Sequence, residues 1–309
     1  MTGRKLFRTG LALAGVAALA TAALAAPAQA ATTSATGTSA ACFASVGSAT
    51  LAHGQTTSSV SGTPPVKSQV RTTHDVYDQP AKLQFTTGYI SEPNISGLDV
   101  SGYFVQAGGL YAHSFSTDGT GEIDPSAPNN VELVGGGWAN FKSLETSVYD
   151  SGSTQRHTAY GLRNDGTLLR WTTGTTWRST GSTAGFGSVK SMALIAKTAS
   201  YDMFLANLSG GALYTIKIPT TVPMKTIVTK IRPSGWSSFE KLIANKCGAS
   251  GTLLLGIDKD TKTGYTYAIS HANGAATVIQ SLGKVNGTFP DAVNFRWGVV
   301  PDLDPLTGG

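Results

Sequence analysis

Charged residues are scarce in this sequence. Asp, Glu, Lys and Arg make up 13% of the 309 residues, whereas glycine alone accounts for 37 positions. The basic residues are not clustered, and three of them, Arg4, Lys5 and Arg8, lie at the very start of the chain. A nucleic-acid-binding domain concentrates Lys and Arg on one surface. The composition therefore excludes nucleic acid as a partner and favours short strands joined by tight turns.

Long apolar runs are also rare. After the first thirty residues, no run approaches the roughly 20 apolar residues of a membrane-spanning helix, so we expect no membrane partner. Residues 1–30 have a basic start, an apolar run from Leu11 to Ala26, and the small-x-small sequence Ala28-Gln29-Ala30. This pattern predicts a cleaved secretory signal peptide and a secreted, extracellular protein. An uncleaved N-terminal anchor is the alternative.

Cysteine occurs only twice, at Cys42 and Cys247. In an oxidising extracellular setting, two cysteines predict one disulfide, here between the start of the mature chain and a late segment. Two free thiols are the alternative.

Motifs for metals, cofactors and nucleophiles are missing. The five histidines have no metal-ligand spacing, and the sequence contains no phosphate-binding loop and no dinucleotide fingerprint. No Gly-x-Ser-x-Gly sequence stands out as a nucleophile elbow. We therefore expect neither a metal nor a cofactor.

A repeat is the most informative feature that is present. The segment Gly137–Leu144 returns as Gly235–Leu242, with Trp138 and Trp236 separated by 98 residues. A degenerate copy, Gly185–Met192, lies almost halfway between them. The repeating unit is thus about 49 residues long, a period typical of propellers, solenoids and tandem arrays.

Each unit predicts four short strands. An apolar strand is followed by a turn with Gly, a second strand, and a Gly-Trp-x-x-Phe type segment that leads into the next unit. Turns of the Asp-Gly and Gly-Gly type between apolar strands are strong hairpin signals, because they need a positive φ. The turn glycines Gly119, Gly166, Gly211 and Gly264 recur at intervals of 47, 45 and 53 residues.

These units predict an all-β fold, a β-propeller with five blades of four antiparallel strands. Stacked sheets hide their apolar faces against each other, and a closed ring leaves only short edges. A fifth unit is expected from about Thr50 to Val100, with a candidate strand at Leu83-Gln84-Phe85. The terminal strand around Phe295–Val300 is expected to close the ring against the N-terminal unit. An open pair of β-sandwiches is the alternative.

The domain boundaries follow from composition. We predict the signal peptide over 1–30, a Ser/Thr/Ala-rich leader over 31–50, one propeller domain over 51–302 and a tail over 303–309. The sequence that begins near Phe43 can still supply a strand.

Two motifs carry a family resemblance. Asn164-Asp165-Gly166-Thr167-Leu168-x-Arg170-Trp171 and Gly137-Trp138-x-Asn140-Phe141-Lys142 resemble the repeats of the tachylectin-type five-bladed propeller lectins. The resemblance extends from about Gly97 to Phe295. It implies a five-bladed propeller that binds N-acetylated amino sugars at several equivalent sites. The second unit departs from the pattern at Phe186 and Val189, and the fourth unit has no matching tryptophan, so only some units are expected to keep a site.

The function expected from this resemblance is a secreted, non-catalytic carbohydrate-binding protein. Its partners would be glycans of the N-acetylglucosamine or N-acetylgalactosamine type, bound between blades. Aromatic rings would stack on the sugar, and planar polar groups would bind its hydroxyl and acetamide groups. The candidate ligand-binding residues are Asp118, Trp138, Asn140, Asn164, Asp165, Trp171, Trp177 and Trp236.

Each candidate also has a structural explanation. Trp138 and Trp236 recur at the same place in the repeat, which is typical of core packing between blades. Asp118, Asn164 and Asp165 lie in turns, where such side chains bind their own backbone. Two other functions stay open: a scaffold that binds a secreted protein partner, and an extracellular glycan hydrolase or lyase. A hydrolase needs two carboxylates about 5–10 Å apart, and the acids Asp118, Glu122, Asp124 and Glu132 single out no pair.

Overall fold

The computed structural model describes residues 42–300 and 305–309. The described residues belong to a compact unit that spans Gly37–Gly309. Their regular structure is β-strand apart from two short 3-10 turns, η2 (Pro80–Lys82) and η3 (Trp138–Asn140). The all-β prediction is therefore confirmed, while the predicted signal peptide, residues 1–30, lies outside the described residues. Within the described ranges, no helix has the length and apolar character needed to cross a membrane.

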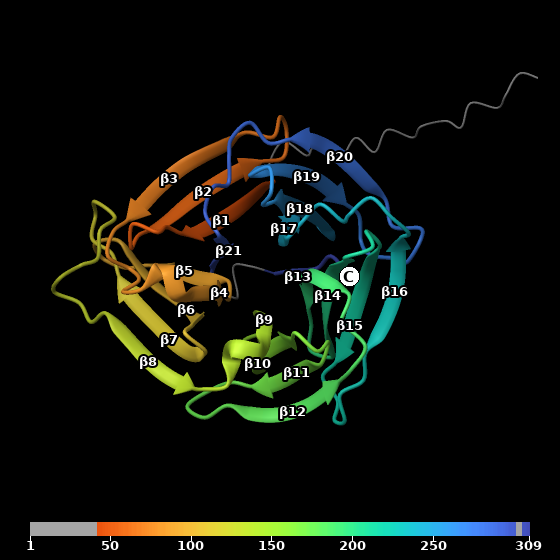
Figure 1. Cartoon of the computed structure of the whole chain (residues 1–309), viewed down its shortest axis with the longest axis horizontal. Coiled ribbons are helices and arrows are strands. Elements are labelled where there is room, and N and C mark those ends of the chain that lie inside the picture. The colour runs from red at the N-terminus through yellow and green to blue at the C-terminus, as the bar shows by residue number, and fades with distance from the viewer. Residues whose placement is uncertain (1–41, 301–304) are drawn as a thin grey trace, which may run out of the picture. The chain divides into compact units, whose positions relative to one another are not determined.

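Three of the sheets have four antiparallel strands each and follow one another along the chain (Figure 1). Sheet II consists of β9 (Phe141–Asp150), β10 (Gln155–Arg163), β11 (Leu168–Thr172) and β12 (Arg178–Thr183). Sheet III consists of β13 (Val189–Lys197), β14 (Tyr201–Leu208), β15 (Leu213–Pro219) and β16 (Ile227–Arg232). Sheet IV consists of β17 (Lys241–Cys247), β18 (Gly251–Asp258), β19 (Thr263–Ile269) and β20 (Ile279–Lys284). The first strand of each sheet lies innermost, and the sheets surround a common axis in a propeller-like arrangement.

Sheet I is larger and mixed. One part, half A, has the order β21-β1-β2-β3, and the other, half B, has the order β5-β6-β7-β8, with β4 paired to β6. The strands of half A are β21 (Val293–Val299), β1 (Phe43–Ala49), β2 (Gln55–Ser61) and β3 (Lys67–Thr73). The strands of half B are β4 (Leu83–Thr86), β5 (Tyr89–Pro93), β6 (Leu98–Gln106), β7 (Gly109–Ser116) and β8 (Asn130–Gly135).

The C-terminal strand β21 joins the two halves of sheet I. It pairs antiparallel with β1, where Val46 lies opposite Arg296, and parallel with β5, where Trp297 lies opposite Tyr89. The expected pairing between terminal and N-terminal strands is thus present. The expectation of five separate four-stranded sheets differs from the structure, because β21 has a partner on each side and merges two of them.

The N-terminal strands differ from their sequence-based ranges. Strand β1 lies within the range 31–50 that composition suggests as a leader, and its Ala and Val side chains are buried. The range Thr50–Val100, expected as one unit, contains β2 and β3 of half A together with β4 and β5 of half B. Small residues made β1 inconspicuous in the sequence.

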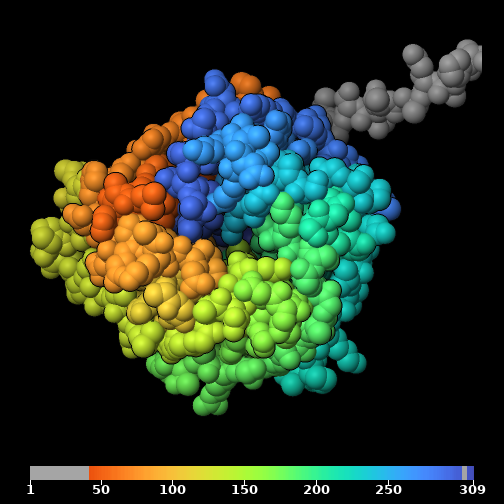
Figure 2. All heavy atoms as spheres, viewed as in Figure 1, coloured from red at the N-terminus to blue at the C-terminus, as the bar shows by residue number. Residues whose placement is uncertain are grey.

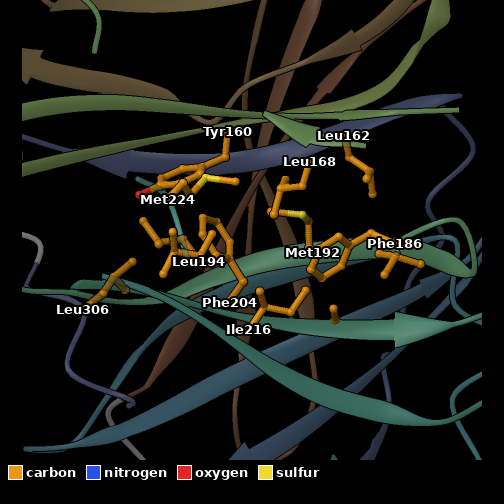
Figure 3. Packing of buried hydrophobic residues seen from close by; sticks show 13 residues of the cluster. Tyr160, Leu162, Leu168, Phe186, Met192, Leu194, Phe204, Ile216, Met224 and Leu306 are labelled. Atoms are coloured by element: carbon orange, nitrogen blue, oxygen red, sulfur yellow. The ribbon is translucent and has the colours of Figure 1, made fainter. Parts of the chain in front are cut away.

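The hydrophobic core lies between neighbouring sheets. The cluster between sheets II and III includes Tyr160, Leu168, Met192 and Phe204, which point toward one another in Figure 3. The outer strands are the least buried, as in β8 and β12. Side chains fill most of the space between the sheets, and the face shown in Figure 2 is hollowed near its middle.

Some of the aromatic residues pack directly on glycines of the second strand. A Cβ atom built on Gly256 of β18 would lie 2.8 Å from the ring of Phe239, and one on Gly161 of β10 would lie 2.8 Å from the ring of Phe141. Real Cβ atoms do not approach rings this closely, so the glycines allow the close packing.

The segment 305–309 fits against sheets III and IV. The backbone N–H of Gly308 donates to Ile195 O at 2.9 Å, and Gly308 O accepts from Ala272 N at 2.8 Å. Leu306 is buried and belongs to the core cluster between sheets II and III (Figure 3). These contacts join β13 of sheet III to the segment that follows β19 of sheet IV, so residues 305–309 tie neighbouring sheets together.

The predicted disulfide between Cys42 and Cys247 is confirmed. It joins the start of β1 to the end of β17, with the two Cα atoms 5.2 Å apart and 205 residues between them in sequence. The bond therefore connects half A of sheet I to sheet IV.

Removing this disulfide should destabilise the fold. Cross-linking residues this far apart reduces the freedom of the unfolded chain, and loss of such a native bridge costs about 2–5 kcal/mol. We expect a Cys42→Ser, Cys247→Ser variant to lose that much unfolding free energy in guanidinium titration. Equal midpoints for the variant and the oxidised wild type would contradict this role.

Gly256→Ala should also destabilise the protein, because the new methyl group collides with the ring of Phe239. Overpacking a core typically costs about 1–3 kcal/mol. Gly210→Ala is the matched control, since a Cβ atom there meets nothing within 4 Å. The same denaturant titration compares the two variants, and a loss no greater for Gly256→Ala than for the control would refute the packing argument.

Candidate functional site

The starts of the innermost strands enclose a polar cavity of about 150 Å³ on the axis. This axial cavity is lined by residues of β4, by residues at or just before the starts of β9, β13, β17 and β21, and by Lys259 in the turn after β18. Its charged residues are Lys142, Lys190, Glu240, Lys241 and Lys259. Its hydroxyl and amide residues are Gln84, Thr86, Ser143, Ser191 and Asn294. All the sheets therefore contribute to one cavity, in which lysines outnumber carboxylates four to one.

Two of the lysines form hydrogen bonds to the sheet that follows their own, one from sheet II to sheet III and one from sheet III to sheet IV. Lys142 Nζ of sheet II donates to the carbonyl oxygens of Gly187 at 3.2 Å and Val189 at 2.6 Å, at the start of sheet III. Lys190 Nζ of sheet III makes the equivalent contacts to sheet IV, where it donates to Ser237 O and to Glu240 Oε1, both at 2.6 Å. These bonds hold both ammonium groups at the edge of the axial cavity.

Lys241 lies deeper along the axis. Its Nζ forms an ion pair with Glu145 Oε1 of β9 at 3.1 Å, and both side chains are largely buried. Lys241 also lines a second, smaller void of about 40 Å³ on the axis, which Leu306 and Arg296 help to enclose. Glu145 lines the smaller void and Lys241 lines both, so the ion pair between sheets II and IV lies where the two spaces adjoin.

Glu240 positions Lys259. Its Oε2 accepts the backbone N–H of Lys259 at 2.9 Å, while its Oε1 receives Lys190. The side-chain amine of Lys259 donates to the carbonyl oxygen of Ala292, just before β21. The turn after β18 is therefore held by Glu240 through its backbone and by Ala292 through the side chain of Lys259. The amine of Lys259 lies at the cavity wall.

Burial changes the acidity of these amines. Desolvation, together with the nearby charge of Lys241, lowers the pKa of Lys259 to about 8 against the raising effects of Asp291 and Glu240. Desolvation also lowers the pKa of Lys142. The cavity therefore holds cations that lack full solvation.

Three polar atoms in the walls have no hydrogen-bond partner among the described residues. They are Thr86 Oγ1, Ser143 Oγ and Asn294 Oδ1. Thr86 and Asn294 are only 3% and 5% exposed. Buried polar groups are normally paired, so three unpaired atoms around one cavity indicate a place for a bound polar molecule or water.

The tryptophans that the sequence singled out lie elsewhere. Trp138, Trp171 and Trp177 come together between half B and sheet II, with ring centroids 5.4 to 6.1 Å apart. Trp236 lies apart from them, against Tyr267 and Phe239. Trp138 and Trp236 are 7% and 5% exposed and belong to hydrophobic clusters, whereas Trp171 and Trp177 are half-buried.

The predicted polar site residues take part in turns. Asp118 Oδ1 accepts from the Thr120 hydroxyl at 2.6 Å, and this bond is the main cause of its lowered pKa. Asp165 Oδ1 accepts from Thr167 N–H, which lowers the pKa of Asp165, and its other oxygen pairs with Arg163 at 2.7 Å. The backbone of exposed Asn164 donates to the carbonyl of Asn140 at 2.8 Å. These four residues do not converge on one cavity.

A wider cleft of about 440 Å³ opens between half B and sheet II. Tyr103, His157, Glu92 and Glu132 are among its lining residues. Glu92 lies on β5 and Glu132 on β8, with two strands between them, so their backbones are roughly 14 Å apart across the sheet. This spacing is too wide for two carboxylates that flank one glycosidic bond.

The axial residues were missed because the sequence analysis followed tryptophans and turns. A signal was present: the position after Phe141, Val189 and Phe239 in the repeated segment is always charged, as Lys142, Lys190 and Glu240. Among the described residues, no group of three or more His, Cys, Asp and Glu side chains could hold a metal ion.

Comparison with known proteins gives matches only among solved structures. No family model matches the chain, and no curated protein matches it. The catalytic domain of the GH62 alpha-L-arabinofuranosidase of Coprinopsis cinerea has a TM-score of 0.45 and 13% identity, over 71% of this chain and 75% of that one. The periplasmic gluconolactonase of Pseudomonas aeruginosa has a TM-score of 0.42 and 11% identity, over 77% and 78%. The Aleuria aurantia lectin in complex with alpha-methyl-L-fucoside has a TM-score of 0.39 and 12% identity, over 65% and 63%.

These comparisons correct the predicted function. The prediction of a non-catalytic lectin is wrong, because catalytic domains and a lactonase stand beside a lectin among the similar structures. The expectation that the chain is not an enzyme is overturned with it. The similar structures are β-propeller folds, whereas the tachylectin-type assignment rests on motif resemblance alone. At 11–13% identity, no site residue is carried over from any of these proteins.

Proposed function

We propose that the chain is an extracellular carbohydrate-active enzyme whose reaction centre is the axial cavity. The two halves of sheet I count as two blades in this proposal, which gives a five-bladed propeller. The observation that carries it is the convergence of four lysines, Glu240 and three unpaired polar atoms on one cavity at the axis.

The chemistry of the cavity suits a hydroxylated substrate. Thr86 and Ser143 can each donate and accept a hydrogen bond, and Asn294 Oδ1 accepts one. A sugar presents hydroxyl groups that need such partners, and a site whose polar groups are unpaired when empty gains most from binding them. This supports a carbohydrate as the ligand class.

The cavity also contains groups that can transfer protons. An amine with a pKa of about 8 exchanges its proton near neutral pH, where general acid–base catalysis is most effective. Perturbed acidities cluster at functional sites more often than elsewhere. The inter-blade tryptophans offer no titratable group of this kind, which is why the reaction is assigned to the axis.

Glu240→Gln tests this assignment. The substitution removes the charge that pairs with Lys190 and weakens the acceptor that fixes Lys259, so we expect kcat/KM to fall about a hundredfold. The measurement is release of reducing ends from a panel of neutral and acidic polysaccharides. Glu122→Gln is the matched control, because Glu122 pairs with His74 at the surface, 2.7 Å away, and should keep full activity.

Failure of the wild-type protein to release reducing ends from any polymer of the panel would overturn the proposed function. Loss of activity in Glu122→Gln, with Glu240→Gln unaffected, would move the reaction centre away from the axis. Thermal unfolding of both variants verifies that any loss of activity is not a loss of fold.

A further inference from the structure

The axial cavity carries more positive charge than a neutral sugar requires. We propose that it binds the carboxylate of a uronic acid residue, and that the enzyme cleaves acidic polysaccharides by β-elimination with Lys259 as the base. This inference rests on the proposed function, and it names the substrate class and the reaction of the same site.

The lysines have hydrogen-bond donors to spare for a carboxylate. An ammonium group has three N–H donors. Lys142 and Lys190 each use two of them on the protein contacts described above, and Lys241 uses one on Glu145. A carboxylate in the cavity would receive the remaining donors as charge-assisted hydrogen bonds, which are stronger than neutral ones.

The electrostatic balance also favours an anion. Desolvation disfavours the charge of Lys259, and Lys241 is close enough for its repulsion to lower the pKa of Lys259 as well. Among the described residues, Glu240 is the only carboxylate that lines the axial cavity, and it is already paired with Lys190, while Glu145 pairs with Lys241 from the adjoining smaller void. A bound carboxylate would relieve this repulsion, whereas a neutral ligand would leave it in place.

The size of the cavity sets how the substrate can lie. About 150 Å³ admits the acid edge of one sugar ring but not a chain of several sugars. The polar side chains of Gln84, Thr86 and Ser191 line the cavity and would face the hydroxyl groups of that ring. The polymer would therefore cross the mouth of the cavity with one uronate residue turned inward.

Lys259 is the group that can act as the base. Its amine must be neutral to accept a proton, and with a pKa of about 8 half of the molecules are neutral at that pH. The amine is held toward Ala292, and its backbone is fixed by Glu240. The charged groups that act on it are Lys241, Glu240 and Asp291, and the first of these favours the neutral form.

The reaction balances without water or an oxidant. The lone pair of Lys259 Nζ takes the proton from the carbon next to the carboxylate, and the electrons move onto the carboxylate, where the ammonium groups stabilise the extra charge. The electrons then return to form a carbon–carbon double bond as the adjacent carbon–oxygen bond breaks. The leaving oxygen takes up a proton from the protonated Lys259. One product is an unsaturated uronate, and the other is a chain with a new reducing end.

The test compares two readouts on two kinds of polymer. Wild-type protein is incubated with polygalacturonate and with starch, and reducing ends and the ultraviolet absorbance of the conjugated double bond are measured together. We expect equal amounts of both from polygalacturonate and neither from starch. The kcat/KM on polygalacturonate should rise with pH through about 8, because the unprotonated amine of the free enzyme is the active form.

Lys259→Arg distinguishes the role of Lys259 as a base from the role of its positive charge. Arginine keeps the positive charge but stays protonated, so turnover should fall at least about a hundredfold while glucuronate still binds in calorimetry. Lys246→Arg, at an exposed position of β17, is the matched control and should retain activity.

The outcomes distinguish the two proposals. Reducing ends without the ultraviolet signal, from any polymer, would overturn β-elimination and leave the proposed function standing. Full turnover by Lys259→Arg would overturn the choice of base. No turnover together with no binding of glucuronate would overturn both the substrate class and the reaction.

Discussion

The contact that each Gly-Trp-x-x-Phe segment makes with the preceding sheet is the constraint on which the rest of the structure depends. In sheet IV, the ring of Phe239 packs on Gly256, and the backbone carbonyls of Trp236 and Phe239 accept from Asn207 Nδ2 of sheet III at 2.8 and 2.7 Å. Asn207 is fully buried, so these bonds replace water and are costly to lose. The segment leads directly into the innermost strand. Its packed position therefore determines which residue at the start of that strand lies at the axis.

That geometry explains why charge accumulates where burial disfavours it. The residue that follows the packed Phe or Val is Lys142 in sheet II, Lys190 in sheet III and Glu240 in sheet IV. Backbone carbonyls of the next sheet neutralise Lys142 only in part, since they carry partial rather than full charges. Partly buried cations without carboxylate partners cost stability. Lys190 pairs with Glu240 and Lys241 with Glu145, so Lys142 and Lys259 are the cavity lysines without a carboxylate partner among the described residues, and a bound anion would give them one.

The repeat let the sequence predict much of the fold, but not the connections made by distant segments. The recurring turns around Gly166, Gly211 and Gly264 located the hairpins of sheets II to IV, and the presence of only two cysteines, together with the predicted signal peptide, located the disulfide. The mixed topology of sheet I was not predicted, because the parallel pairing of β21 with β5 joins residues far apart in sequence and leaves no local pattern. Strand β1 was not predicted as part of the propeller domain because it is rich in Ala, Ser and Gly, and its buried side chains pack on distant segments, sheet IV and Phe295. For the site, periodicity pointed to tryptophans, yet a position that recurs in a ring of sheets is first of all a packing position, as the burial of Trp138 and Trp236 illustrates.

The differences among the repeats have a chemical meaning at the axis. Equivalent sites between blades would have to stay alike in order to bind the same ligand several times, and the eroded units at Phe186 and Val189 count against that. For the proposed reaction at a single cavity shared by all the sheets, the requirement is the opposite, because proton transfer and charge stabilisation would need different groups around one substrate. Lys142 and Lys190 are the second residues of β9 and β13, whereas the second residue of β21 is Asn294 and Glu240 directly precedes β17. The same packing of an aromatic or aliphatic residue thus places each innermost strand at the axis. The residues at the strand starts differ from sheet to sheet, so the charges around the cavity are distributed asymmetrically.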